Sequence, residues 1–201
     1  MKNLNTKVAV ILGSPHYNKP FESLYECVNI NPSKPEDHWK SLVAYSDLVV
    51  FTGGADVDPS LYGEAKHSTT YSDIDRDIFE GKVFELCREC EIPMTGICRG
   101  AQFLTVMNGG KLIQDVAGHT RTHDTVSVIE KSRCVTKTKH MKVTSTHHQM
   151  MYPYDLPNKY YDVLSATTLE GVRQYEGIPE GLNQPFKMGV SDKMEPEVVW
   201  Y

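Results

Sequence analysis

Three short apolar runs separated by helix-like segments constrain the fold of this chain more than any other feature. The runs lie within residues 7–13 (KVAVILG), 47–54 (DLVVFTGG) and 92–97 (IPMTGI). Strands of a parallel sheet are covered on both faces, so they appear as continuous apolar runs. Residues 36–45 and 72–91 lie between these runs and have apolar residues at helical intervals. The alternation predicts a mainly parallel α/β sheet with helices on both faces.

The remaining segments complete this expected architecture. Residues 20–30 are expected to form a helical or loop connection, and residues 99–110 a helix that ends at Asn-Gly-Gly. The second half predicts an antiparallel extension, because it contains strand-like segments joined by turns, at residues 125–130, 141–146, 161–168 and 196–201. A chain of 201 residues suffices for one full-sized core, so we expect a single domain.

Charge and apolar runs narrow the choice of partner. The chain has 21 Lys and Arg against 26 Asp and Glu, a net charge of −5, and no basic block of five or more. Binding to nucleic acid or to an anionic membrane is therefore not expected, and a small molecule fits better. The N-terminal apolar run is too short for a signal sequence or a bilayer span, which predicts a cytoplasmic protein.

The cysteines indicate reduced thiols. There are five, an odd and scattered set that does not suit a disulfide framework. Only Cys87 and Cys90 have CxxC spacing, and no further ligands at metal-site spacing accompany them. We expect two helix positions that face the core, with no metal and no cofactor.

Cys98 is the candidate nucleophile. It falls where the strand at residues 92–97 ends and the helix at residues 99–110 begins, bracketed by Gly96 and Gly100. A residue at such a turn projects from the sheet edge, and the helix N-terminus favours a thiolate. The alternative is a packed thiol at a tight turn.

Two glycines are expected to line the same edge of the sheet. Gly53 and Gly54 directly follow the strand at residues 47–54, so their N–H groups are candidates for an oxyanion hole. Asp58 and Pro59, further along, are interpreted as a turn, since Asp-Pro initiates turns regardless of chemistry.

Several motifs together resemble a known family. They are TGGADVDPSLYGE at residues 52–64, RDIFE at 76–80, IPMTGICRGAQFLTVMNGGKLIQDV at 92–116 and STHHQ at 145–149. In this order they resemble the gamma-glutamyl hydrolase branch of the class I glutamine amidotransferase-like superfamily, in particular the gamma-glutamyl-gamma-aminobutyrate hydrolases. The resemblance covers roughly residues 45–175. It implies a flavodoxin-like α/β/α sandwich and hydrolysis of a gamma-glutamyl amide through a cysteine thioester.

The resemblance also implies roles for individual positions. Cys98 corresponds to the nucleophile, and the N–H groups of Gly54 and Arg99 to the oxyanion hole. The substrate-binding positions are Gly53, Gln102 and the backbone around Ser145, Thr146 and His147. No metal or cofactor is implied. The substrate is a gamma-glutamyl compound or glutamine.

The chain departs from the family in one respect, because no His-Pro-Glu occurs in it. In the alignment that we favour, residues 195–201 form the strand before the catalytic segment, and the chain stops before His-Pro-Glu. In the other, residues 188–197 are that segment, with Glu195 in place of histidine. His147 and His148 are weighed as substitute bases, of which at most one can face Cys98 if they lie on a strand.

Other histidines fit a catalytic role less well. His119 and His123 are expected to be solvated or near the substrate.

Three functions follow from these observations. The first is a gamma-glutamyl hydrolase, the second a glutaminase subunit that hands ammonia to a synthetase partner, and the third a binding module that has lost the His–Glu pair.

Overall fold

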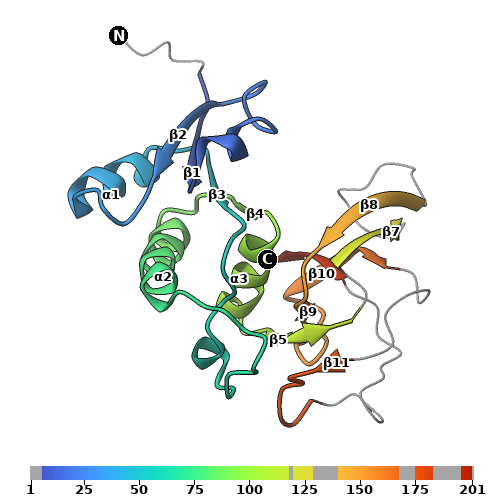
Figure 1. The fold of residues 1–201 in the computed structure, drawn as a ribbon. Helices are drawn as coiled ribbons and strands as arrows, with labels where there is room; N and C mark the ends of the chain where they lie inside the picture. The colour runs from blue at the N-terminus through green and yellow to red at the C-terminus, as the bar shows by residue number, and fades with distance from the viewer. Residues whose placement is uncertain (1–5, 118–119, 129–139, 168–174, 183–195, 201) are drawn as a thin grey trace. The chain divides into compact units, whose positions relative to one another are not determined.

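The computed structural model describes residues 6–117, 120–128, 140–167, 175–182 and 196–200 (Figure 1). The chain divides into two compact units by the contacts within each. Unit 1 comprises Met1–Asp58 and Tyr71–Met107, and unit 2 comprises Pro59–Thr70 and Asn108–Tyr201. Each unit is continuous in space but made of two sequence segments. The expectation of a single domain stays a prediction.

Unit 1 contains a parallel sheet, as the apolar runs predict. Its strands are β1 (Val8–Leu12), β2 (Glu26–Ile30), β3 (Leu48–Phe51) and β4 (Met94–Gly96), in the order β2-β1-β3-β4. All five residues of β1 are buried, since this strand is paired on both sides. The order matches the beginning of the flavodoxin-like order, in which ligands bind at the carboxyl edge between the first and third strands.

Three helices and one 3₁₀ turn belong to unit 1. They are η1 (Pro15–Asn18), α1 (Glu36–Ala44), α2 (Ile74–Glu89) and α3 (Arg99–Met107). Asp73 caps α2 by accepting a hydrogen bond from the Arg76 N–H. Trp39 of α1 packs edge-on against Phe79 of α2, and Phe103 of α3 stacks on Phe51 of β3. The helices expected within residues 72–91 and 99–110 are confirmed, and the helical or loop connection expected at residues 36–45 is a helix.

The expected connection at residues 20–30 is wrong in its second half, which forms β2. Phe21, Leu24, Tyr25 and Val28 follow a helical spacing, but the helical turns end where the Tyr25 N–H donates to the Phe21 carbonyl. From Glu26 the chain instead pairs with β1 along five residues. Pairing with a buried strand overrides the local periodicity, because the sheet edge buries Ile30.

Unit 2 contains the expected antiparallel strands. These are β7 (Thr120–Val128), β8 (His140–Thr146), β10 (Tyr161–Thr167) and β12 (Pro196–Trp200), in the order β12-β10-β7-β8. Two small pairs were not expected from the sequence: β5 (Lys111–Ile113) with β9 (Met150–Tyr152), and β6 (Asp115–Val116) with β11 (Tyr175–Glu176). A short 3₁₀ turn, η2 (Pro59–Tyr62), opens the unit.

Residues of the two small strand pairs, β5 with β9 and β6 with β11, form a hydrophobic core in unit 2. Its buried members are Ile113, Val116, Met150, Tyr152 and Tyr175. Residues 188–195, which hold most of the alternative catalytic segment, lie outside the described residues. Among the helices of the described residues, none is long and apolar enough to cross a membrane.

Candidate active site

Cys98 occupies a strained turn between β4 and α3. Its φ of 55° lies in the left-handed region, where Glu91 is the only other non-glycine among the described residues. Such a conformation costs about 1–3 kcal/mol and persists only where the surroundings enforce it. The Cys98 carbonyl accepts hydrogen bonds from the N–H groups of Ala101 and Gln102, at 2.9 and 3.3 Å, and so starts α3. Cys98 is exposed to solvent.

The glycines around Cys98 enforce this turn. A Cβ on Gly96 would overlap the backbone of Gly100 and Ala101, and a Cβ on Gly100 would overlap the Phe51 carbonyl of β3. The strand, the turn and the helix therefore pack backbone against backbone, which only glycine permits. The sequence GICRG thus folds into the strand–turn–helix geometry typical of a catalytic nucleophile.

The turn after β3 lies next to Cys98. A Cβ on Gly53 would sit 3.6 Å from the Cys98 Cβ and 2.7 Å from the Tyr17 hydroxyl. Gly54 has a φ of 139°, and a Cβ there would overlap Nη1 of Arg76. The structure therefore brings together Gly53 and Cys98, which were expected from the sequence at one sheet edge.

Arg76 of α2 holds the Gly53–Gly54 turn. Its guanidinium donates to the Gly53 carbonyl at 3.1 Å and to the Thr52 carbonyl at 2.9 Å, and Nε donates to Glu80 at 2.8 Å. The peptide bond between Gly53 and Gly54 is trans, because no cis peptide occurs among the described residues. In a trans peptide the carbonyl and the N–H point in opposite directions, so the Gly54 N–H points away from the Gly53 carbonyl that Arg76 binds. Within those residues the N–H groups of Gly54 and Arg99 have no hydrogen-bond partner. Both N–H groups are therefore available as hydrogen-bond donors.

The side chain of Arg99 has a separate role from its N–H group. It is 2% exposed and forms ion pairs with Asp77 and Glu80 of α2. Burial raises the pKa of the Asp77 carboxyl, while the hydrogen bond from the Asp58 N–H and the charge of Arg99 act in the opposite direction. The network ties α3, which starts at Arg99, to α2, whose Arg76 holds the glycine turn.

Arg76, Asp77 and Glu80 were not predicted as site residues from the sequence. Their motif, RDIFE, was noted only for its family resemblance. Its signal is physical: Asp77 and Glu80 are buried at the same face of α2 as Phe79 and Val83, and buried carboxylates require cationic partners. A charged triplet within the apolar face of a predicted helix is therefore the pattern to look for.

Gln102 is buried in α3, one turn after Cys98. Gly53 and Gln102 lie in unit 1 with Cys98, whereas the remaining expected substrate-binding positions, at residues 145–147, belong to unit 2. Thr146 ends β8 and is exposed, whereas the side chain of Ser145 lies outside the described residues. His147 turns its Nδ1 toward the Gln149 carbonyl at 3.0 Å. Their binding roles stay predictions.

His147 and His148 lie in the connection between β8 and β9, so strand alternation does not decide which way each of them faces. Nδ1 of His148 is 3.4 Å from an oxygen of Asp115. A carboxylate at Nδ1 orients the ring and leaves Nε2 able to accept a proton. His119 and the side chain of His123 lie outside the described residues.

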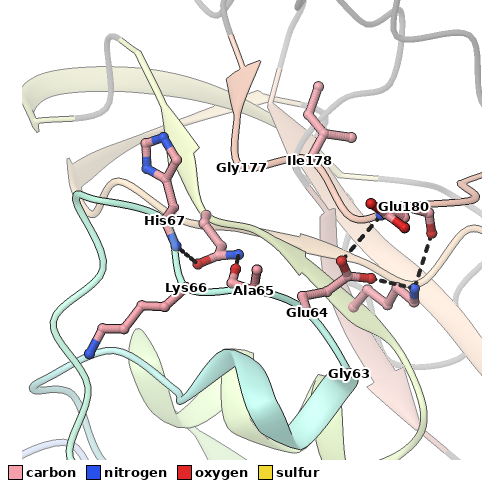
Figure 2. Close-up of a pocket in the computed structure, with 10 residues that line it drawn as sticks. Gly63, Glu64, Ala65, Lys66, His67, Gly177, Ile178 and Glu180 are labelled. Carbon is pink, nitrogen blue, oxygen red and sulfur yellow. Dashed lines mark hydrogen bonds and ion pairs between the residues drawn. The ribbon is translucent and has the colours of Figure 1, made fainter.

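Unit 2 also contains a cavity of about 620 Å³ (Figure 2). Its walls come from residues 63–67, from Lys111 and Gln114, and from Gly177, Ile178 and Glu180. Lys111 binds Glu64 at 2.7 Å, and Gln114 accepts from the His67 N–H and donates to the Ala65 carbonyl. These polar groups bind one another, and none of the site residues predicted from the sequence lines the cavity.

No metal centre is evident in the part of the chain that the structure describes. Within it, no group of three or more His, Cys, Asp or Glu side chains is arranged to hold an ion.

Comparisons with known proteins agree with this geometry. The sequence pattern of the family described as peptidase C26 matches residues 23–173. A glutamine amidotransferase-like protein, YvdE of Lactococcus lactis subsp. lactis, is 35% identical over 148 residues, which cover 65% of this chain and 61% of the relative. Its homolog from subsp. cremoris is 38% identical over 98 residues, 48% of this chain and 52% of the relative. The matches thus span between half and two thirds of these relatives' length.

Solved structures share the fold. A glutamine amidotransferase of Thermotoga maritima superposes with a TM-score of 0.57 at 16% identity, over 86% of this chain and 72% of the other. A protein of Thermoplasma acidophilum described as part of a GMP synthase gives 0.57 at 18% identity, over 86% and 78%. At these identities the likeness shows the fold alone, and it confirms the predicted flavodoxin-like α/β class.

Proposed function

Because the chain belongs to the peptidase C26 family, we propose that it is a hydrolase of gamma-glutamyl amide bonds that acts through a thioester on Cys98. The backbone of Cys98 carries the proposal. Its φ of 55° presents an exposed thiol at the start of α3, beside the Gly53–Gly54 turn. A nucleophile of acyl transfer needs this combination of projection, close approach and nearby N–H donors.

The chemistry proceeds in two stages. The Cys98 thiolate attacks the gamma carbonyl, which forms a carbon–sulfur bond and places negative charge on the carbonyl oxygen. The N–H groups of Gly54 and Arg99 donate to that oxygen. The adduct then breaks its carbon–nitrogen bond, and the amine leaves with a proton. Water hydrolyses the thioester, which releases glutamate and restores the thiol.

The reaction also needs a group that removes the thiol proton and returns one to the amine. Such assistance is commonly worth about 10²–10⁴ in rate. The family resemblance points to a His-Pro-Glu, which the 201 residues do not contain. Within unit 2, His148 and Asp115 have the mutual arrangement of a base and its orienting carboxylate. We therefore expect the 201-residue chain to turn over slowly.

Hydrolysis of gamma-glutamyl p-nitroanilide tests the proposal. Release of p-nitroaniline is expected to be slow, to be lost in Cys98→Ser and to survive in Cys90→Ser, the matched control with an exposed thiol. A version extended through a downstream His-Pro-Glu should be about 10²–10⁴ faster. Equal rates in the native chain and Cys98→Ser would contradict the proposal. Fast turnover by the 201-residue chain would make His147→Gln and His148→Gln the next variants.

A second candidate is a glutaminase subunit, favoured by the names of the relatives, which refer to glutamine amidotransferases. Ammonia release from glutamine that is faster than amine release from other gamma-glutamyl amides, and that rises with a synthetase partner, would support it. The third candidate, a binding module, predicts that glutamine or a gamma-glutamyl amide protects Cys98 from alkylation without any turnover.

A further inference from the structure

The 3₁₀ turn after β1 places an aromatic residue at the carboxyl edge of the parallel sheet. Asn18, the last residue of η1, exchanges amide hydrogen bonds with Asn29 of β2 at 3.0 and 3.1 Å. Asn29 also donates to the Gly13 carbonyl at 3.1 Å. These bonds tie both ends of the turn to the sheet, so Tyr17 within it has a defined position.

The ring of half-buried Tyr17 is also held by packing contacts. It packs against the cluster formed by Ala9, Ile11 and Val50 on one face of the sheet. The exposed ring of His16 lies against it, with 4.3 Å between the ring centroids. Because these contacts fix the ring, they also fix where its hydroxyl points.

The hydroxyl of Tyr17 lies beside the candidate nucleophile. It is 2.7 Å from the position that a Cβ would take on Gly53, and the Cys98 Cβ is 3.6 Å from that same position. Glycine at residue 53 thus leaves a gap between the phenol and the cysteine. Among the described residues the Tyr17 hydroxyl has no hydrogen-bond partner, so its donor is available. The gap lies between the ends of β1 and β3, where this strand order binds ligands.

We propose that Tyr17 is a substrate-contacting residue whose hydroxyl donates a hydrogen bond to the carbonyl oxygen of an acyl group on Cys98. It adds a third donor to the N–H groups of Gly54 and Arg99. The phenol keeps its proton throughout, so no bond to Tyr17 forms or breaks. Its donation strengthens as charge develops on the oxygen. The inference rests on the proposed thioester chemistry, but it does not require gamma-glutamyl specificity.

The test compares two reactions of the same thiol in the native chain and in Tyr17→Phe. Acylation by p-nitrophenyl acetate passes through an oxyanion and needs no proton on its leaving group, whereas alkylation by iodoacetamide forms no oxyanion. Both rates are measured at Cys98 by peptide mass mapping, with Cys98→Ser as the background. Tyr17→Phe is expected to slow acylation about 10- to 100-fold, the value of a hydrogen bond to a charged group. Alkylation should change less than about two-fold.

Tyr25→Phe is the matched control. Tyr25 packs on the same cluster, but it precedes β2 and so lies at the opposite, amino edge of the sheet. Its variant should leave both rates unchanged. Three results would overturn the inference: equal acylation in the native chain and Tyr17→Phe, equal slowing of both reactions, or no acylation of native Cys98 above background.

The outcome is separable from that of the proposed function. If Tyr17→Phe slows acylation while no gamma-glutamyl compound is cleaved, the role of Tyr17 stands and the substrate class is wrong. If gamma-glutamyl p-nitroanilide is cleaved and Tyr17→Phe acylates normally, the proposed function stands and the role of Tyr17 is wrong.

Discussion

Cys98 combines a left-handed backbone, an exposed thiol and a helix that begins at the next residue. The strain at this residue is sustained by Gly96 and Gly100, whose missing side chains let β3, β4 and α3 approach each other. None of the other described cysteines combines these features. Burial, together with the nearby Cys90, raises the pKa of Cys87 to about 12, and burial and Glu22 raise the pKa of Cys27. Reactivity at the residue scale should follow these environments.

We therefore expect Cys98 to be alkylated first by limiting iodoacetamide at neutral pH. Cys90 is the informative comparison, because the expectation that it faces the core is wrong: it is exposed and follows the end of a helix, where the dipole disfavours a thiolate. Cys87 should remain unlabelled as the pH rises from 7 to 10, since its thiol ionises only near pH 12 in the folded chain. Peptide mass mapping measures all of these rates. Faster labelling of Cys87 or Cys90 than of Cys98 would contradict the assignment.

Gly54→Ala should reduce acyl transfer more than it reduces stability. The side chain would meet Arg76, move the turn and misdirect its N–H, and the loss of one oxyanion donor costs about 10²–10³ in kcat. The φ of 139° adds a strain of about 1–3 kcal/mol.

Gly63→Ala is the control for that strain. Gly63 also has a positive φ, 76°, but a Cβ there would contact nothing. Urea unfolding and the acylation rate of Cys98 should separate the two variants. Comparable acylation in both would show that Gly54 serves only the turn.

At the scale of elements, α2 is the support on which the candidate site depends. Arg76 reaches the glycine turn after β3, and Asp77 and Glu80 hold Arg99 at the start of α3. The sequence predicted α2 as an amphipathic helix, but it did not show which residues the charged groups on its buried face would bind. Periodicity identifies which residues face inward, whereas ion pairing depends on which other elements meet that face. The position of Cys98 between strand and helix could be predicted, because it depends on residues adjacent in sequence.

Arg99→Met should destabilise the chain by about 3–5 kcal/mol. The substitution keeps an apolar side chain of similar length over Phe103 but leaves Asp77 as a buried charge without its cationic partner and Glu80 with Arg76 alone. Arg88→Met is the matched control. Like Arg99, Arg88 lies over a phenylalanine ring, that of Phe84, but it is exposed. It should change the free energy of unfolding by less than about 0.5 kcal/mol. Urea denaturation measures both, and similar losses in the two variants would contradict the role of the network.

At the scale of the whole molecule, the chain folds into two units, each built from two separate segments of the sequence. Strands β1, β3 and β4 of the parallel sheet and the four longer antiparallel strands could be predicted, because each shows its own apolar pattern, whereas β2 could not. The assignment of Pro59–Thr70 to unit 2 could not, since it depends on side chains far away in the chain. Gln114 binds the backbone of His67 and Ala65, and Lys111 binds Glu64, each across 47 to 49 residues. Nothing in the local sequence of residues 59–70 encodes these partners.

Gln114→Leu should loosen this segment while the rest of unit 2 stays protected. The half-buried His67 N–H would lose its acceptor, at a cost of up to about 1–3 kcal/mol, the range for a buried donor left unsatisfied. Amide hydrogen exchange at His67 should therefore speed up about 10- to 100-fold. The Val116 amide, which donates to the His148 carbonyl at 2.7 Å, serves as the internal control. Equal acceleration of both amides would indicate global destabilisation instead.

The split of unit 2 into two sequence segments also sets the order of events during synthesis on the ribosome. The Glu180 N–H donates to the Glu64 carboxylate across 116 residues. At about 5–20 residues per second, Glu64 waits on the order of ten seconds for that donor to be made. The strands of unit 1 need no such delay, because β4 and α3 follow within the next few dozen residues. The nascent chain is therefore expected to complete its thiol-bearing turn while residues 59–70 are still an open loop, exposed to chaperones and proteases.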